Sequence, residues 1–199
     1  MLQLSFVLLL LITIIIPANL RVFILPILLI LFLFLGNKKP FFLLQIIIFL
    51  VGFPIYLRVF NKDLTTINNI FVVELFIIQL MKGYRPNKKI LVPGILLIFL
   101  YIINIRHYPS AELVMRSSRF IFSLFCGFLL CFLIQWEMKT THKFLTILKM
   151  LIIVVVIQSL ISILQVTLPA FIDPIVSLFS DRTSSGSVGL AGGLFRGSG

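Results

Sequence analysis

Charged residues are scarce in this sequence, and acidic residues are the scarcest of them. Only 12% of the 199 residues are Asp, Glu, Lys or Arg, whereas about a quarter are charged in soluble domains. Hydrophobic residues make up 60% of the chain. This composition excludes an ordinary soluble domain and predicts a membrane protein. Because each span takes about 20 residues, the chain has room for roughly six to eight spans with their connections.

Cysteine and histidine are also rare, which limits disulfide and metal chemistry. Cys126 and Cys131 lie five residues apart in one apolar segment, and a helix would hold their Cα atoms about 8 Å apart, too far for an unstrained disulfide. His107 and His142 have no Asp, Glu or Cys at ligand spacing. No nucleotide-binding or hydrolase motif occurs. We therefore expect no metal and no cofactor.

Long apolar runs dominate the sequence instead. Their lengths fit helices better than barrel strands, which need only about ten alternating residues. We predict an all-α fold, a polytopic transmembrane helix bundle of about seven segments in residues 1–168, followed by an outer Gly-rich loop in residues 169–199. The predicted segments are Leu2–Ile16, Leu20–Leu35, Pro40–Leu57, Leu64–Met81, Ile90–Ile105, Ser118–Trp136 and Phe144–Leu168. Residues 2–35 fit either two short tilted spans or a re-entrant hairpin.

The net charge of +11 does not indicate nucleic-acid binding. Lys and Arg occupy the short connections, where they meet lipid head groups, rather than a stripe interleaved with aromatic residues. Alternating segments place nine basic residues on one side and eight on the other. The dense clusters NKKP, KGYRPNKK and KTTHKFLTILK, together with the long polar tail, favour a cytoplasmic lysine side and N-terminus, with residues 169–199 outside.

The two sides differ more clearly in the type of basic residue. The side that we assign to the cytoplasm carries eight Lys and one Arg, and the other side carries seven Arg and one Lys. The planar fork of arginine suits bidentate binding of phosphate or carboxylate groups. The bias therefore indicates either an outer face that handles an anionic group or a chance composition.

Arg116 and Arg119, in the stretch VMRSSRF, are the first candidates for such binding. They lie three residues apart and share a helix face, so they could either grip one diphosphate or anchor the helix end to lipid head groups. Gln158 and Gln165 lie seven residues apart on one face, which fits helix packing or a cavity lining. Glu74, inside an apolar segment, fits a structural contact between helices or proton coupling.

Arg196 lies in the Gly-rich tail. Residues 184–199 contain six glycines, which predicts a flexible loop. In such a loop the arginine and the backbone amides could approach a phosphate closely. The alternative is simple disorder at a terminus.

In order and character these features resemble the N-terminal half of bacterial O-antigen polymerase and O-antigen ligase-type membrane proteins. The resemblance rests on short apolar helices with lysine-rich connections, the arginine-bearing stretch VMRSSRF, the stretch ISILQ that ends at Gln165, and an R-x-x-G motif that begins at Arg196. It covers most of the chain, and the glutamine followed by R-x-x-G is its most specific part.

The resemblance implies metal-independent glycosyl transfer on the outer face of the bacterial inner membrane, in the assembly of O-antigen for lipopolysaccharide, of capsule or of exopolysaccharide. The substrate would be a glycan on a polyprenyl diphosphate, bound by Arg196, Arg119 and Arg116 with Gln165 nearby. Membrane lipids and other polysaccharide-assembly proteins are further expected partners, and nucleic acid is not. The chain would then be an inactive N-terminal portion of a glycosyltransferase-type polymerase. An O-antigen ligase, a transporter or flippase component, and a small non-enzymatic scaffold are the alternatives.

Overall fold

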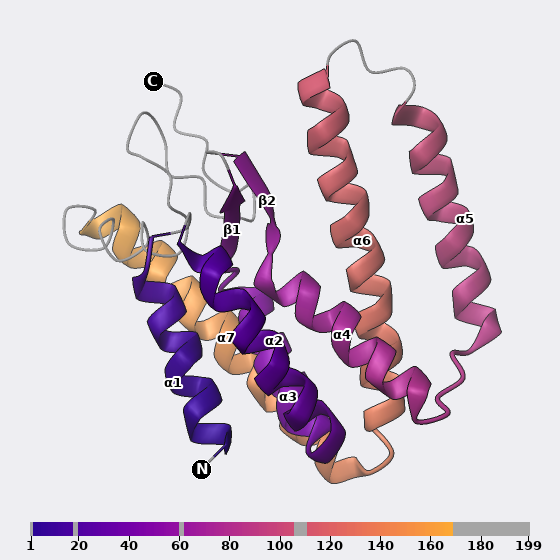
Figure 1. The fold of residues 1–199 in the computed structure, drawn as a ribbon, viewed down its shortest axis with the longest axis horizontal. Helices are drawn as coiled ribbons and strands as arrows, with labels where there is room; N and C mark the ends of the chain where they lie inside the picture. The colour runs from indigo at the N-terminus through magenta and orange to yellow at the C-terminus, as the bar shows by residue number, and fades with distance from the viewer. Residues whose placement is uncertain (1, 18–19, 60–61, 106–110, 169–199) are drawn as a thin grey trace.

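The computed structural model describes residues 2–17, 20–59, 62–105 and 111–168, and shows a mostly helical chain (Figure 1). Its elements are α1 (Leu2–Ile15), α2 (Arg21–Lys38), α3 (Pro40–Gly52), β1 (Tyr56–Val59), β2 (Lys62–Thr66), α4 (Ile67–Met81), α5 (Lys88–Ile105), α6 (Ala111–Glu137) and α7 (Thr141–Thr167). Consecutive helices run in opposite directions, so their ends gather at two sides (Figure 1). We call these the hairpin end, which holds β1 and β2, and the lysine end, which holds residues 38–39, 82–87 and 138–140.

The helical prediction is confirmed. Each predicted apolar segment corresponds to one helix, and residues 2–35 form two helices, α1 and α2. Three helices, namely α2, α6 from Leu113 onward and α7, are long and apolar enough to cross a membrane. The other four are shorter apolar helices.

The antiparallel pair β1 and β2 corrects two predicted helix boundaries. We expected helix to continue to Leu57 and to resume at Leu64, but α3 ends at Gly52 and α4 begins at Ile67. Pro54 explains the first difference, because proline lacks a backbone N–H and disfavours helical geometry in the residue before it. Aromatic and β-branched residues then favour strands, and Tyr56 pairs with Thr66 in the register.

Three phenylalanine rings mark the centre of the packed core. Phe6 of α1, Phe32 of α2 and Phe71 of α4 are fully buried. The centroids of the Phe32 and Phe71 rings lie 4.3 Å apart in a stacked arrangement, and the Phe6 ring lies 6.0 Å from the first and 5.8 Å from the second. Stacked and tilted pairs of this kind add to the stabilisation from burial. The first two helices are thereby fixed against α4.

Arg21, the first residue of α2, is the largest fully buried side chain, with 1% of its surface exposed. Its Nε donates to Thr13 O at 2.9 Å and Ile16 O at 3.0 Å, and its Nη2 donates to Ile14 O at 3.1 Å. Thr13 and Ile14 lie in the last turn of α1, where carbonyls have no partner within the helix, and Ile16 follows directly after it. Its Nη1 donates to Tyr56 O of β1 at 3.1 Å. One guanidinium therefore joins α1, α2 and the hairpin.

Lys82 performs a similar task at the lysine end. Its Nζ donates to Gly36 O at 2.9 Å and to Asn37 O at 2.7 Å, near the end of α2. The helices approach closely here, because a Cβ atom at Gly36 would lie 2.6 Å from Ile78 Cδ1. A positive charge at a helix C-terminus is also favoured by the helix dipole. The end of α4 is thus joined to the end of α2.

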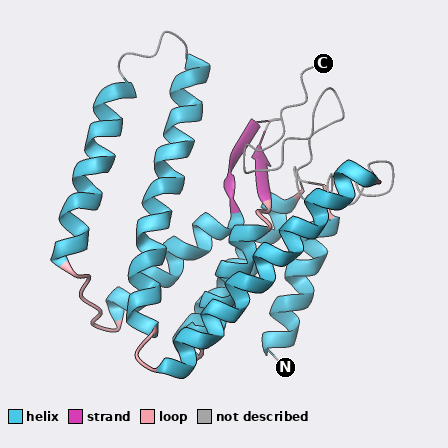
Figure 2. Cartoon of the chain, turned by 180° about the vertical axis from the view of Figure 1, so that it is seen from behind, coloured by secondary structure: helices cyan, strands magenta, loops and turns pink. Residues whose placement is uncertain are grey.

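The outer helices expose apolar side chains. In α7 only 11% of the most apolar stretch of the helix is buried inside the protein. Figure 2 shows α5 beside α6, away from the other helices. Its exposed apolar residues are Val92, Ile95, Leu96, Leu97, Phe99, Leu100, Tyr101, Ile102 and Ile103. Exposed apolar surface of this extent marks an interaction site, and the acyl chains of a membrane are a partner that fits it.

Replacing Arg21 with methionine should destabilise the fold strongly. Arg21→Met keeps a long side chain but leaves several buried carbonyls without a donor, which should lower the free energy of unfolding by about 3 kcal/mol. Unfolding in mixed micelles, followed by circular dichroism as the denaturing detergent increases, measures the loss. The exposed Lys38→Met is the matched control and should change stability by less than about 0.5 kcal/mol. Equal unfolding of the two variants would show that the Arg21 contacts do not hold α1.

Candidate functional site

The hairpin end is where the sequence places the arginine candidates, and the structure describes part of it. Arg119 lies near the start of α6, is half-buried, and donates from Nε to Met115 O at 3.4 Å within the same helix. Arg116 lies one turn earlier in α6, and its side chain is outside the described part. Arg196 lies outside the described residues. The predicted pairing of Arg116 with Arg119 on one diphosphate therefore stays a prediction.

Polar side chains connect α4 and α6 next to Arg119. We call the contacts of Thr65, Asn69, Ser123 and Cys126 the polar seam. Ser123 lies four residues and Cys126 seven residues after Arg119, so all three share one face of α6. On that face Ser123 Oγ accepts from Asn69 Nδ2 at 3.1 Å, and Cys126 Sγ donates to Asn69 O at 3.6 Å. Asn69 Nδ2 also donates to Thr65 Oγ1 of β2 at 3.4 Å. The seam thus links the hairpin, α4 and α6 beside Arg119.

The partner of Asn69 is what sequence reasoning missed. The sequence indicated a contact between the α4 segment and another helix through Glu74, but nothing in it pointed to Asn69 or selected Ser123 among several serines. The spacing of four residues between Arg119 and Ser123 was a usable signal, because it puts both residues on the same face of a helix.

Glu74 lies in α4 with its carboxyl group half-buried. Its Oε2 atom is buried and has no hydrogen-bond partner among the described residues. Asn68 Oδ1 and Gln79 Nε2, in the same helix, share this property. Buried polar atoms without partners cost free energy, so these atoms are places where a ligand, a water molecule or a further helix would be accommodated.

The two glutamines of α7 have different surroundings. Gln158 Nε2 donates to Gly52 O at 2.6 Å, which joins α7 to the end of α3. A Cβ atom at Gly52 would overlap Val154 Cγ1, so the two helices are in close contact there. Gln165 lies two turns further toward the hairpin end and is half-buried. The packing alternative therefore holds for Gln158, and the role of Gln165 stays a prediction.

The structure does not bring Gln165 and Arg119 together. From residues 138–140, α6 and α7 diverge, so that the start of α6 and the end of α7 lie on separate arms of the molecule (Figures 1 and 2). Both residues lie toward the hairpin end. A single small ligand would contact one of these residues, whereas a long glycan could extend from one to the other.

The polar seam can be tested with a double-mutant cycle on Asn69 and Ser123. Asn69→Ala and Ser123→Ala should show a coupling energy of about 0.6 kcal/mol, the average for hydrogen bonds between membrane helices, with an upper limit of about 1.7 kcal/mol. Unfolding in mixed micelles provides the four free energies. Ser159, which donates to Val155 O within α7, is the control, and its alanine variant should add to Asn69→Ala within about 0.5 kcal/mol. Additivity of Asn69→Ala and Ser123→Ala would contradict the seam.

Arginine and amide side chains are what the hairpin end offers to a ligand. Among the residues whose side chains are described, no group of three or more His, Cys, Asp or Glu is arranged to hold a metal ion. Comparisons with protein-family models, with curated proteins and with solved structures find no match to the chain.

Proposed function

We propose that the chain, with its seven apolar helices, is part of a bacterial inner-membrane protein that handles polyprenyl-diphosphate-linked glycans in surface polysaccharide assembly. The first candidate reaction is the joining of glycan repeat units, as in O-antigen polymerases. The resemblance of VMRSSRF, ISILQ and R-x-x-G to that family supports the proposal. Apolar outer faces on membrane-length helices support the location.

The observation that carries the proposal is the separation of arginine from lysine between the two ends of the helices. The described arginine positions of the hairpin end are Arg21, Arg58, Arg116 and Arg119, whereas Arg85 is the one described arginine at the lysine end. Arg21 is not open to a ligand, because its guanidinium binds backbone carbonyls. Among the arginines whose side chains are described, Arg119 remains as the candidate for diphosphate binding, and it lies beside the polar seam.

The proposed reaction places negative charge where arginine can stabilise it. A hydroxyl oxygen of the acceptor sugar forms a bond to the anomeric carbon of the donor glycan, and the bond from that carbon to the diphosphate oxygen breaks. The polyprenyl diphosphate leaves with the bonding electron pair, and the hydroxyl proton is released to solvent. Guanidinium groups beside the diphosphate stabilise the charge that develops on it. An O-antigen ligase would use the same donor with a different lipid acceptor.

Glu74 favours a second candidate, a transporter or flippase component. Its unpartnered Oε2 atom is a place where a translocated cation or proton would be held. This candidate requires Glu74 for activity, with Arg119 and Arg196 dispensable. The polymerase requires the reverse, so Glu74→Gln and Arg196→Ala separate the two candidates in one polysaccharide assembly assay.

Loss of a candidate arginine should weaken diphosphate binding. With farnesyl diphosphate as the probe and the full chain in detergent, Arg119→Ala and Arg196→Ala should each raise Kd by about 10- to 100-fold, because each removes a charge-assisted hydrogen bond. Isothermal titration calorimetry measures the constants. Arg119→Lys should recover part of the loss, since lysine retains the charge but not the planar fork.

Two controls accompany this measurement. Lys38→Ala removes an exposed charge at the opposite end and should leave Kd unchanged. Glu74→Gln should also leave it unchanged. If Arg119→Ala and Arg196→Ala bind the probe as tightly as the parent chain, these arginines do not form a diphosphate site.

The orientation has its own test. Ser187→Cys, in a chain with Cys126 and Cys131 replaced by alanine, should react with a membrane-impermeant maleimide in intact cells after the outer membrane is opened. Lys38→Cys, at the lysine end, should react only after the inner membrane is permeabilised. Labelling in the reverse pattern would place every hairpin-end arginine in the cytoplasm and rule out transfer on the outer face.

A further inference from the structure

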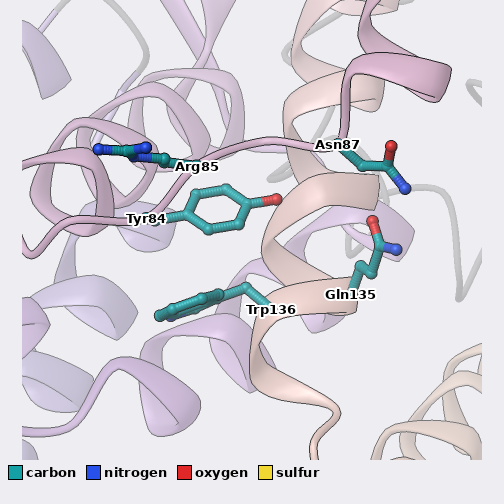
Figure 3. A pocket seen from close by; sticks show the side chains of 5 residues that line it. All are labelled: Tyr84, Arg85, Asn87, Gln135 and Trp136. Atoms are coloured by element: carbon teal, nitrogen blue, oxygen red, sulfur yellow. The ribbon is translucent and has the colours of Figure 1, made fainter.

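A cavity of about 210 Å³ lies at the lysine end, where the connection between α4 and α5 meets the end of α6. It is lined by Tyr84, Arg85, Asn87, Gln135 and Trp136. Figure 3 shows the Tyr84 ring between the Arg85 and Trp136 side chains, and the amide ends of Asn87 and Gln135 facing each other. None of the lining residues is acidic. The site lies opposite the proposed diphosphate site and is independent of it.

The aromatic wall of the cavity is held in place by several contacts. Tyr84 is 6% exposed, and its hydroxyl donates to Phe132 O at 3.2 Å. Its ring lies 4.7 Å from the Trp136 ring and makes an edge contact with Phe76 at 6.1 Å. Burial raises the pKa of Tyr84, so its hydroxyl stays neutral. A wall fixed in this way needs little rearrangement to bind a ligand.

The polar wall is also fixed in part. Asn87 Oδ1 accepts from Lys89 N at 3.0 Å and Asn87 O accepts from Leu91 N at 3.0 Å, so Asn87 caps the start of α5. With its oxygen engaged, Asn87 has its Nδ2 group left to donate. The guanidinium of Arg85, the Gln135 amide and the indole N–H of Trp136 are further donors on the lining residues.

In the described part of the chain, the acid next to this cavity is already paired with another lysine. Lys139 Nζ lies 3.7 Å from the centroid of the Trp136 ring, a cation–π contact that holds the charge beside the cavity. Glu137, the neighbouring acid, is paired with Lys143 Nζ at 2.9 Å. The charges of Arg85 and Lys139 therefore remain for an anion.

The volume of the cavity and the residues around it indicate which class of anion it binds. Pockets for drug-sized ligands hold about 300–1,000 Å³, so a cavity of about 210 Å³ suits a head group rather than a whole glycan. Exposed apolar side chains lie at the same end of α4, namely Ile77, Leu80 and Met81. Trp and Tyr are typical of the membrane interface. An anion that carries acyl chains fits the cavity volume, the exposed apolar side chains and the interfacial Trp and Tyr, whereas free phosphate leaves the apolar side chains uncovered.

We propose that this cavity binds the phosphate head group of an anionic phospholipid. Arg85 and Lys139 supply the charge, Asn87, Gln135 and Trp136 supply neutral donors, and the acyl chains lie along the exposed face of α4. The bound lipid joins the α4–α5 connection to the end of α6 and so fixes the α5–α6 pair against the rest of the molecule.

The single tryptophan of the chain makes the proposal directly measurable, because Trp136 is in the cavity wall. The full chain in detergent is titrated with dihexanoyl phosphatidylglycerol below its micelle concentration, and Trp136 fluorescence is recorded. We expect a saturable change with this lipid and none with dihexanoyl phosphatidylcholine. Glycerol 1-phosphate, which carries the same phosphate without acyl chains, should bind at least about 10-fold more weakly.

Variants separate a built site from diffuse attraction. Arg85→Gln should weaken phosphatidylglycerol binding by about 10- to 100-fold. Lys38→Gln loses the same charge at the same end, away from the cavity, and should bind as the parent chain does. Native mass spectrometry of lipid-bound Arg85→Gln and of the parent chain gives a second readout that is independent of fluorescence.

Three results would overturn the proposal. An equal response to phosphatidylcholine would show detergent-like insertion, and an equal affinity for glycerol 1-phosphate would show a site for free phosphate. Equal weakening by Lys38→Gln and Arg85→Gln would show that general charge attraction holds the lipid.

Discussion

The arrangement of the helices depends on how the carbonyl groups at the helix ends find donors where water is excluded. A helix leaves its last four C=O groups without partners of its own, and at membrane depth each such group costs free energy. Arg21 supplies these donors for α1. Because Arg21 is also the first residue of α2 and donates to Tyr56 O, it also determines where the hairpin lies. The negative end of the α1 dipole stabilises its charge in return. A change at this residue would therefore act on α1, α2 and β1 together.

Side chains from neighbouring helices satisfy other helix ends in the same way. Lys82 donates to carbonyls at the end of α2, and Gln158 donates to the last carbonyl of α3. Each of these hydrogen bonds joins residues that are far apart in the sequence. The bundle is consequently joined at its ends by polar contacts, while the middle of its outer helices presents apolar side chains. This division is what a surrounding apolar phase requires, since the polar groups are satisfied internally and the remaining surface needs no water.

The helices could be predicted from the sequence because long apolar runs and the prolines between them act locally. The hairpin could not, because Tyr56 and Leu57 continue the apolar character of the α3 segment, and strand pairing depends on a partner segment. From the sequence Arg21 is only one of the seven arginines assigned to the outer side, and the position of α1 reveals that carbonyls take its donors. The cavity beside Trp136 was missed for the same reason, since its walls come from a connection and a helix that are about 50 residues apart in the chain.

Arginine and lysine are used differently within this molecule, and the difference refines how their distribution should be interpreted. Lys82 and Lys143 each serve one or two acceptors at a helix end or a carboxylate, which a compact ammonium group can do. Arg21 serves four carbonyls, which only a planar fork of donors can reach at once. An arginine therefore indicates a convergence of acceptors, but these can be backbone carbonyls as readily as phosphate oxygens. Burial separates the two uses. Arg21 is enclosed by backbone, whereas Arg85 is exposed beside a cavity and Arg119 is half-buried at the end of a polar seam, so among the arginines whose side chains are described these two are open to a ligand.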